Sequence, residues 1–105
     1  MAAYGMTASS IGVSVTNDNW LDVVVYAVRG SMRVRIGEVI GNSTAQLKIP
    51  RNLVVANEVR LMVDPIGSTE RFLSEPIFVD LDQRVQLTVA PAVAMSSFAV
   101  YARPR

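Results

Sequence analysis

Apolar and polar residues alternate along most of this 105-residue chain, and this pattern predicts β-strands rather than helices. In IGVSV, for example, the isoleucine and both valines share one face of the expected strand. Loops rich in Gly, Asn, Asp and Ser separate such segments, and no segment has a helical period of useful length. We expect strands at residues 11–15, 21–29, 32–40, 44–50, 58–65, 71–79, 84–89 and 97–101.

This arrangement of seven to eight short strands predicts an all-β fold. Turn residues every 8 to 12 positions are typical of an antiparallel sandwich of immunoglobulin (Ig) or fibronectin type III character. A small closed barrel is the alternative. The length fits a single domain, 1–105, with tails of small and apolar residues at 1–10 and 90–105. Pro76 interrupts the strand expected at 71–79, which indicates an edge strand or one that changes sheets.

The segment 21–29 has apolar side chains on both faces, whereas a sandwich buries only one face of each strand. Its second face consists of Val24, Tyr26 and Val28, and the C-terminal tail is also apolar. Exposed apolar surface marks protein interfaces, although neighbouring loops could cover it instead. The predicted interface, with arginines at its polar rim, comprises Val24, Tyr26, Val28, Arg33, Arg35, Met95, Phe98, Val100, Tyr101 and Arg103.

The composition removes much of the usual chemistry of enzymes. The chain has no histidine and no cysteine, so it lacks the commonest general base, the commonest zinc ligand and any thiolate. Ten basic and nine acidic residues are spread along the chain without a basic block, which disfavours binding to a phosphate backbone. We therefore expect no enzymatic activity, no cofactor and no nucleic-acid partner.

One segment, VDPIGSTERF at 63–72, nevertheless contains the residue types of a catalytic or binding loop. Ser68 is a potential nucleophile, but no histidine can activate it, and a Ser–Lys pair would need the single lysine, Lys48, from another strand. Glu70 and Glu75 could act as paired carboxylates only within a cleft. Because a sandwich of this length fills its interior with its own core, we interpret the segment as a corner between strands.

Two loops carry paired acidic residues, and calcium prefers carboxylate ligands. Asp18 and Asp22 belong to one loop, and Asp80 and Asp82 to the other, so a calcium site would form if the loops met at one end of the sandwich. Neither pair belongs to a glycine-spaced D-x-D-x-D sequence, and turn formation is the interpretation that we favour. We expect Trp20, beside the first pair, to fill the core rather than anchor an interface.

The sequence also bears on location. The segment MAAYGMTASS has neither the charged nor the apolar region of a signal peptide, and no apolar run approaches the ~20 residues of a membrane-spanning helix. These features favour the cytoplasmic side, while a periplasmic location stays open if the numbering is that of a mature form.

Three segments taken together, VSVTNDNWLDVVVYAVRGSMRVRIGEV, LKIP and VRLMVDPIGSTERFLSEPIFVDLDQRVQLTV, resemble a group of short bacterial Ig-like sandwich proteins. The resemblance implies an Ig-like fold in an exported, lipoprotein-like protein without assigned activity. This chain departs from the group because it has no lipobox cysteine and no export signal. It is also faintly similar to an accessory subunit of a photosynthetic reaction centre–antenna complex.

These observations predict a non-enzymatic binding module, an accessory subunit that stabilises a larger protein complex. Its partners would be protein subunits, with peripheral attachment to a membrane complex as one arrangement. The alternative is a carbohydrate- or calcium-binding sandwich that uses Trp20, Tyr26 and the acidic loops.

Overall fold

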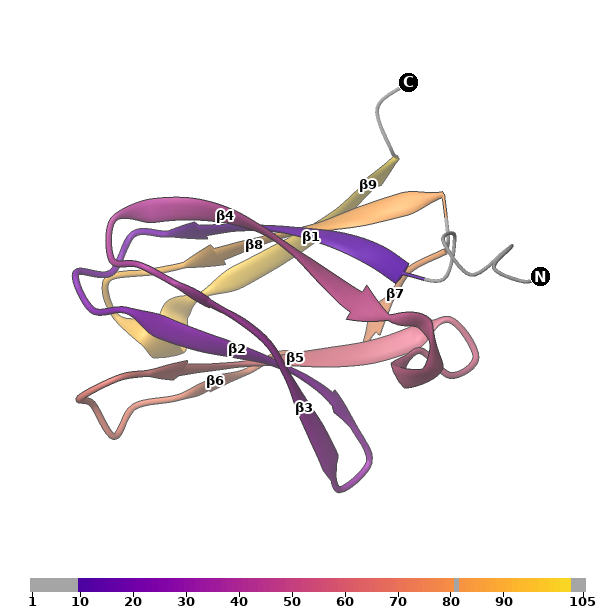
Figure 1. Ribbon diagram of the computed structural model, residues 1–105, viewed down its shortest axis with the longest axis horizontal. Coiled ribbons are helices and arrows are strands. Elements are labelled where there is room, and N and C mark those ends of the chain that lie inside the picture. Colours follow the sequence, from indigo (N-terminus) through magenta and orange to yellow (C-terminus); the bar gives the residue numbers. More distant parts are fainter. Residues whose placement is uncertain (1–9, 81, 103–105) are drawn as a thin grey trace.

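The computed structural model describes residues 10–80 and 82–102, and these form two β-sheets that face each other (Figure 1). The four-stranded sheet has the order β4 (Ser43–Pro50), β1 (Ser10–Asn17), β8 (Gln83–Val89) and β9 (Ser97–Ala102). The five-stranded sheet has the order β3 (Met32–Val39), β2 (Val23–Arg29), β5 (Glu58–Pro65) and β6 (Phe72–Leu73), and β7 (Ile77–Phe78) also pairs with β5. Two short 3-10 helices, η2 (Arg51–Leu53) and η3 (Val93–Met95), lie in loops. The predicted all-β fold is confirmed.

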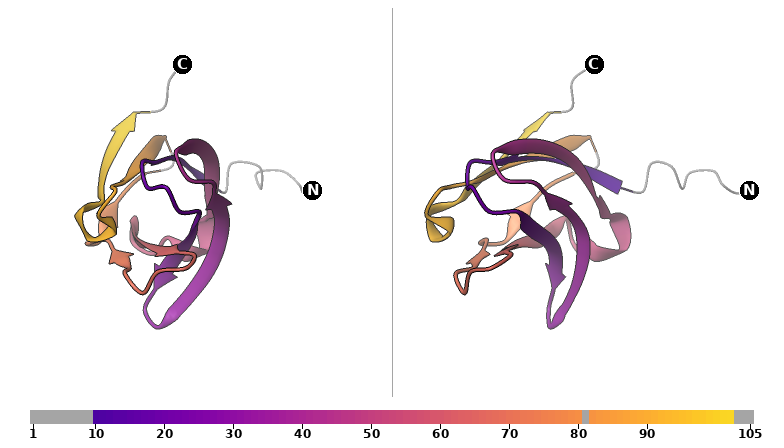
Figure 2. Two further views of the ribbon diagram at one scale, coloured as in Figure 1. Left: turned by 90° about the vertical axis from the view of Figure 1, so that its left-hand side faces the viewer. Right: turned by 60° about the vertical axis from the view of Figure 1, so that its left-hand side comes forward.

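The core forms between the sheets from the residues that the alternating pattern places on one face (Figure 2). In β1 buried and partly exposed positions alternate without exception. Valine is the commonest core residue, since its branched side chain packs well on a pleated surface. No strand pairing joins the two sheets among residues 10–80 and 82–102, so the two sheets do not form the closed barrel considered above.

The four-stranded sheet is mixed, and here the prediction of a purely antiparallel sandwich is wrong. β1 pairs antiparallel with β4 but parallel with β8, in a register that places Val15 opposite Leu87. Counting 71–79 as one segment, the chain reverses direction six times between β1 and β8, so the two strands run in the same direction. A parallel pair requires such a long crossover connection between its strands.

The segment 71–79 forms an interrupted edge rather than one strand. Both of its short strands, β6 and β7, pair with β5, so the segment does not change sheets. Between them, Ser74 completes the ladder with its side chain: the backbone N–H of Leu61 donates to Ser74 Oγ at 2.9 Å. Pro76, which has no backbone N–H to donate, lies between the two strands where their pairing with β5 is interrupted. The expectation of an edge strand is confirmed, and that of a strand changing sheets is wrong.

Within the part of the chain that the structure describes, no helix is long and apolar enough to span a membrane.

Candidate functional site

Four loops gather at the end of the sandwich where β1 finishes, on the left of Figure 1. We call this region the loop end, and it comprises residues 18–22, 40–42, 66–71 and 90–96. The strands themselves bring these loops together, because the register pairs Asn17 with both Ser43 and Val89, and Val23 with Pro65.

Two buried asparagines fasten the loop end. Asn17 Nδ2 donates to the carbonyl oxygens of Leu21 and Val39 at 2.9 and 3.2 Å, and its Oδ1 accepts from the backbone N–H of Asn19 at 3.0 Å. Asn19 in turn donates to the carbonyl oxygen of Pro91 at 2.9 Å and accepts from the Leu21 N–H at 2.9 Å. Both side chains are almost fully buried, and their bonds satisfy backbone groups that are buried, at Val39 and Asn19, or part-buried, at Leu21 and Pro91.

Further hydrogen bonds join the remaining loops to the same centre. Asp22 Oδ1 accepts from the N–H of Gly41 at 2.9 Å, and the Asp22 carbonyl accepts from the N–H of Ile66 at 2.9 Å. The N–H of Asn42 donates to the Asn19 carbonyl at 2.9 Å. The other three loops are therefore all hydrogen-bonded to residues 18–22, which makes the loop end a connected surface rather than a set of independent loops.

Large apolar side chains project from each of these loops. The exposed fraction is 77% for Trp20, 75% for Met95, 66% for Ile40 and 50% for Ile66. The expectation that Trp20 fills the core is wrong, because the alternation of β1 continues past its end and places Asn17 and Asn19 inward and Trp20 outward. Exposed apolar side chains that converge from several loops are typical of a binding surface rather than of a solvated end.

The charges of the loop end are mainly acidic. Its four segments contain three acidic residues, Asp18, Asp22 and Glu70, and one basic residue, Arg71, which gives a net charge of −2. Arg71 lies 3.5 Å from Asp64, at the end of β5, and is partly neutralised by it. An apolar surface with an acidic rim is complementary to an apolar pocket with a basic rim.

The second face of β2 lies on the outside of the five-stranded sheet, where it was expected. Val24 is only 8% exposed, and Tyr26 and Val28 are half-buried, since neighbouring strands contribute side chains such as Met62 to the same face. Val24 therefore offers little surface to a partner, and the interface role of Tyr26 and Val28 stays a prediction.

Arginines cover part of this face. The guanidinium carbon of Arg33 lies 5.2 Å from the ring centroid of Tyr26, a cation–π geometry. Arg35, opposite Tyr26 in the sheet, forms an exposed ion pair with Glu38 at 3.0 Å. Side chains of the neighbouring strands, rather than the loops considered above, thus cover part of the apolar strip.

The C-terminal tail contributes an additional strand. Phe98 and Val100 lie on β9 and pack against the core, whereas Met95 and Tyr101 are exposed, the latter at 37%. Arg103 lies outside the described residues. Of the predicted tail residues, only Met95 belongs to the loop end.

The two acidic pairs do not converge. The N–H of Asp18 bonds to the last residue of β8 at 2.8 Å, while Asp80 and Asp82 directly precede β8. A strand of seven residues, roughly 20 Å long, therefore separates the pairs. Asp22 also uses a carboxylate oxygen for the turn at 40–42. Among the described residues no group of three or more acidic, histidine or cysteine side chains is placed to hold a metal ion, and the suggested calcium site is not formed.

The segment 63–72 is the end of β5 and the loop that leads to β6, as its turn residues predict. Ser68 Oγ accepts the N–H of Glu70 at 3.1 Å, a local turn bond. Lys48 lies in the four-stranded sheet, opposite Gly12 near the start of β1. It is therefore at the other end of the sandwich from Ser68. Glu75 lines a groove, but Glu70 belongs to the loop end. The Ser68–Lys48 pair considered above is therefore not assembled.

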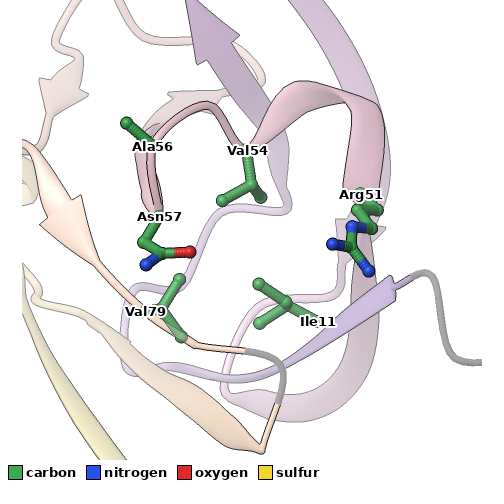
Figure 3. A pocket seen from close by; sticks show the side chains of 6 residues that line it. All are labelled: Ile11, Arg51, Val54, Ala56, Asn57 and Val79. Atoms are coloured by element: carbon green, nitrogen blue, oxygen red, sulfur yellow. The ribbon is translucent and has the colours of Figure 1, made fainter.

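A small hollow lies at the opposite end of the sandwich (Figure 3). It has a volume of about 170 Å³ and is lined by Ile11, Arg51, Val54, Ala56, Asn57 and Val79. Small-molecule sites usually measure roughly 300–1,000 Å³, so this hollow is too small for most of them.

Neither the comparison with protein-family models nor the comparison with curated proteins found a match to this chain. The resemblance to Ig-like lipoproteins therefore stays a prediction, and the functional argument rests on the geometry of the chain itself.

Proposed function

We propose that this protein is a non-enzymatic binding module of Ig-like character, an accessory subunit that docks its loop end on a larger protein complex. The proposal rests on one observation: Trp20, Ile40, Ile66 and Met95 are exposed on loops that hydrogen bonds to residues 17–22 join to one another. Loops fixed before binding lose little conformational freedom when a partner arrives, which favours affinity.

The acidic rim supports a protein partner over an anionic lipid surface. Asp18 and Glu70 are exposed at the loop end, and an anionic bilayer would repel them. A protein pocket lined by apolar side chains and flanked by lysine or arginine complements both features. The sequence was expected to resemble, faintly, an accessory subunit of a membrane-associated photosynthetic reaction centre–antenna complex, and that complex is one assembly to examine for such a pocket.

The test compares loop-end variants with a matched control at the other end of the sandwich. Trp20→Ser and Ile66→Ser each remove an exposed apolar side chain from the loop end, and Phe78→Ser removes one, 65% exposed, from β7. The tagged full chain is first used to purify a stoichiometric partner from the native source. The affinity of each variant for that purified partner is then measured by calorimetry.

We expect Trp20→Ser to weaken binding by about 30-fold or more, since a buried aromatic anchor contributes ~2 kcal/mol or more. Phe78→Ser should bind like the wild type. Trp20 is the single tryptophan, so its emission should also shift to the blue when the partner covers it. Equal affinities for Trp20→Ser, Ile66→Ser and Phe78→Ser would refute docking through the loop end.

A further inference from the structure

The two sheets end in four edges, and three of them carry features that prevent pairing with another strand. Charged side chains, proline and interruptions all block the addition of a strand to a sheet edge. β3 carries two arginines and a glutamate, and β4 carries a lysine and ends at a proline. The edge formed by β6 and β7 is broken after two residues and contains Pro76.

The fourth edge, β9, has none of these features in its described residues. Its sequence, SFAVYA, contains no charge and no proline and is rich in aromatic and β-branched residues. β9 pairs with β8 on one side, and no described residue pairs with it on the other. Half of its backbone N–H and C=O groups are therefore directed away from the sheet, where another β-strand can bind them.

A groove lies beside the start of this edge strand, between side chains of the two sheets. It has a volume of about 370 Å³ and is lined from one sheet by Phe72, Leu73 and Glu75 and from the other by Ser96, Ser97 and Phe98. Leu73 is 48% exposed. A strand added to β9 would direct every second side chain over this groove and cover apolar surface that is now exposed.

We propose that β9 pairs antiparallel with β9 of a second copy of this chain, so that two four-stranded sheets become one continuous eight-stranded sheet. The neutrality of the strand favours a copy of itself, because no like charges are placed opposite each other in any register. The pairing uses the edge of β9 rather than the exposed apolar side chains of the loop end, and it does not depend on the proposed function.

The alternation of the strand restricts the register. Phe98 and Val100 face the core and Ala99 faces outward, so a continuous sheet must pair core-facing residues only with core-facing residues. Around a two-fold axis this condition is met when Ala99 pairs with Ala99 of the second copy. Phe98 then lies opposite Val100 of the second copy, a favourable aromatic–β-branched pair that extends the core.

The absence of cysteine allows a direct test of this register. Cα atoms of directly opposed residues in antiparallel strands are ~4.5 or ~5.5 Å apart, within the roughly 4.4–6.8 Å that disulfides span. Ala99→Cys introduces the sole thiol of the chain and should form a disulfide-linked dimer under mild oxidation. Thr44→Cys, exposed on the outer face of the opposite edge strand β4, is the matched control and should remain monomeric.

Light scattering on the full-length chain supplies the second readout. We expect twice the 11.4 kDa chain mass for the wild type at micromolar concentration. Ala99→Lys places two lysines together at the axis and should raise the dissociation constant at least 10-fold, whereas Thr44→Lys should not change it. Thermal unfolding of each variant checks that it is folded.

A wild-type chain that is monomeric by light scattering would overturn the proposal. This holds also if β9 is found to pair with a strand of another protein. Ala99→Cys that cross-links no faster than Thr44→Cys would overturn it as well.

Discussion

The stability of the loop end should depend on a single amide. Asn17→Ala leaves three backbone groups without their side-chain hydrogen-bond partner. Two of them, the Val39 carbonyl and the Asn19 N–H, are buried, and the third, the Leu21 carbonyl, is partly buried. Leaving a buried backbone group without a partner costs about 1–3 kcal/mol. Taking the lower end of that range, about 1 kcal/mol, for each of the three groups, we expect a loss of about 3 kcal/mol in the free energy of unfolding.

Urea denaturation followed by circular dichroism measures this loss, and thermal unfolding provides a second value. For a domain of this size a loss of about 3 kcal/mol corresponds to a decrease in Tm of roughly 15 °C. Gln46→Ala is the matched control, since Gln46 is an exposed amide whose hydrogen bonds join only side chains, Ser14 and Arg84. We expect it to cost less than about 1 kcal/mol.

The isosteric variant Asn17→Asp separates hydrogen bonding from packing. It preserves the shape and the acceptor for Asn19, but replaces the donor to Leu21 and Val39 with a carboxylate oxygen that faces two carbonyls. Near neutral pH it should cost at least as much as Asn17→Ala. If Asn17→Ala and Gln46→Ala were equally stable, the assignment of Asn17 as the fastening residue would be wrong.

Two other substitutions test nearby contacts by the same unfolding assay. Gly41→Ala would place a Cβ against the backbone carbonyl of Trp20, which cannot move aside without shifting the loop. We expect the free energy of unfolding to fall by about 2 kcal/mol or more. A Tm equal to that of the wild type would contradict this. Arg33→Ala removes the cation over Tyr26 and should cost about 0.5–1 kcal/mol, decreasing at high salt. A cost that does not change with salt would indicate packing by the arginine stem instead.

The strands were predictable because each one satisfies a local rule. The segment 32–40 was expected to be a strand, and β3 covers Met32–Val39. Alternation fixes which face is buried, and turn residues fix where the chain reverses. The pairing between strands was less accessible, because the parallel contact of β1 with β8 joins residues that are about 70 positions apart and is set by packing of the whole domain.

Trp20 shows where composition misleads. A single tryptophan in a small domain is commonly buried. Here Asn17, the last residue of β1, and Asn19 take the inward positions. Their side chains both donate and accept hydrogen bonds, whereas an indole can only donate. The period-two pattern, continued three residues past Asn17, would have placed Trp20 outward. Asparagine at an inward position was the signal that sequence reasoning missed.

The position of each loop in the order of strands also predicts the end of the sandwich at which that loop lies. In a chain that reverses direction at every turn, the loops after the first, third, fifth and seventh strands lie at one end. Counting 71–79 as one segment, these are the loops that carry Trp20, Ile40, Ile66 and Met95. The same count assigns the two acidic loops to opposite ends and excludes a shared calcium site.

Taken together, the two proposed surfaces determine the geometry of an assembly. β9 begins directly after the loop end, at Ser97, and runs away from it. When two β9 strands pair antiparallel, the two loop ends must therefore point in opposite directions along the joined sheet. Such a dimer cannot place both loop ends on one flat surface, so it gains no avidity on a single partner face. It can instead link two partner subunits, which is the action expected of a subunit that stabilises a larger complex.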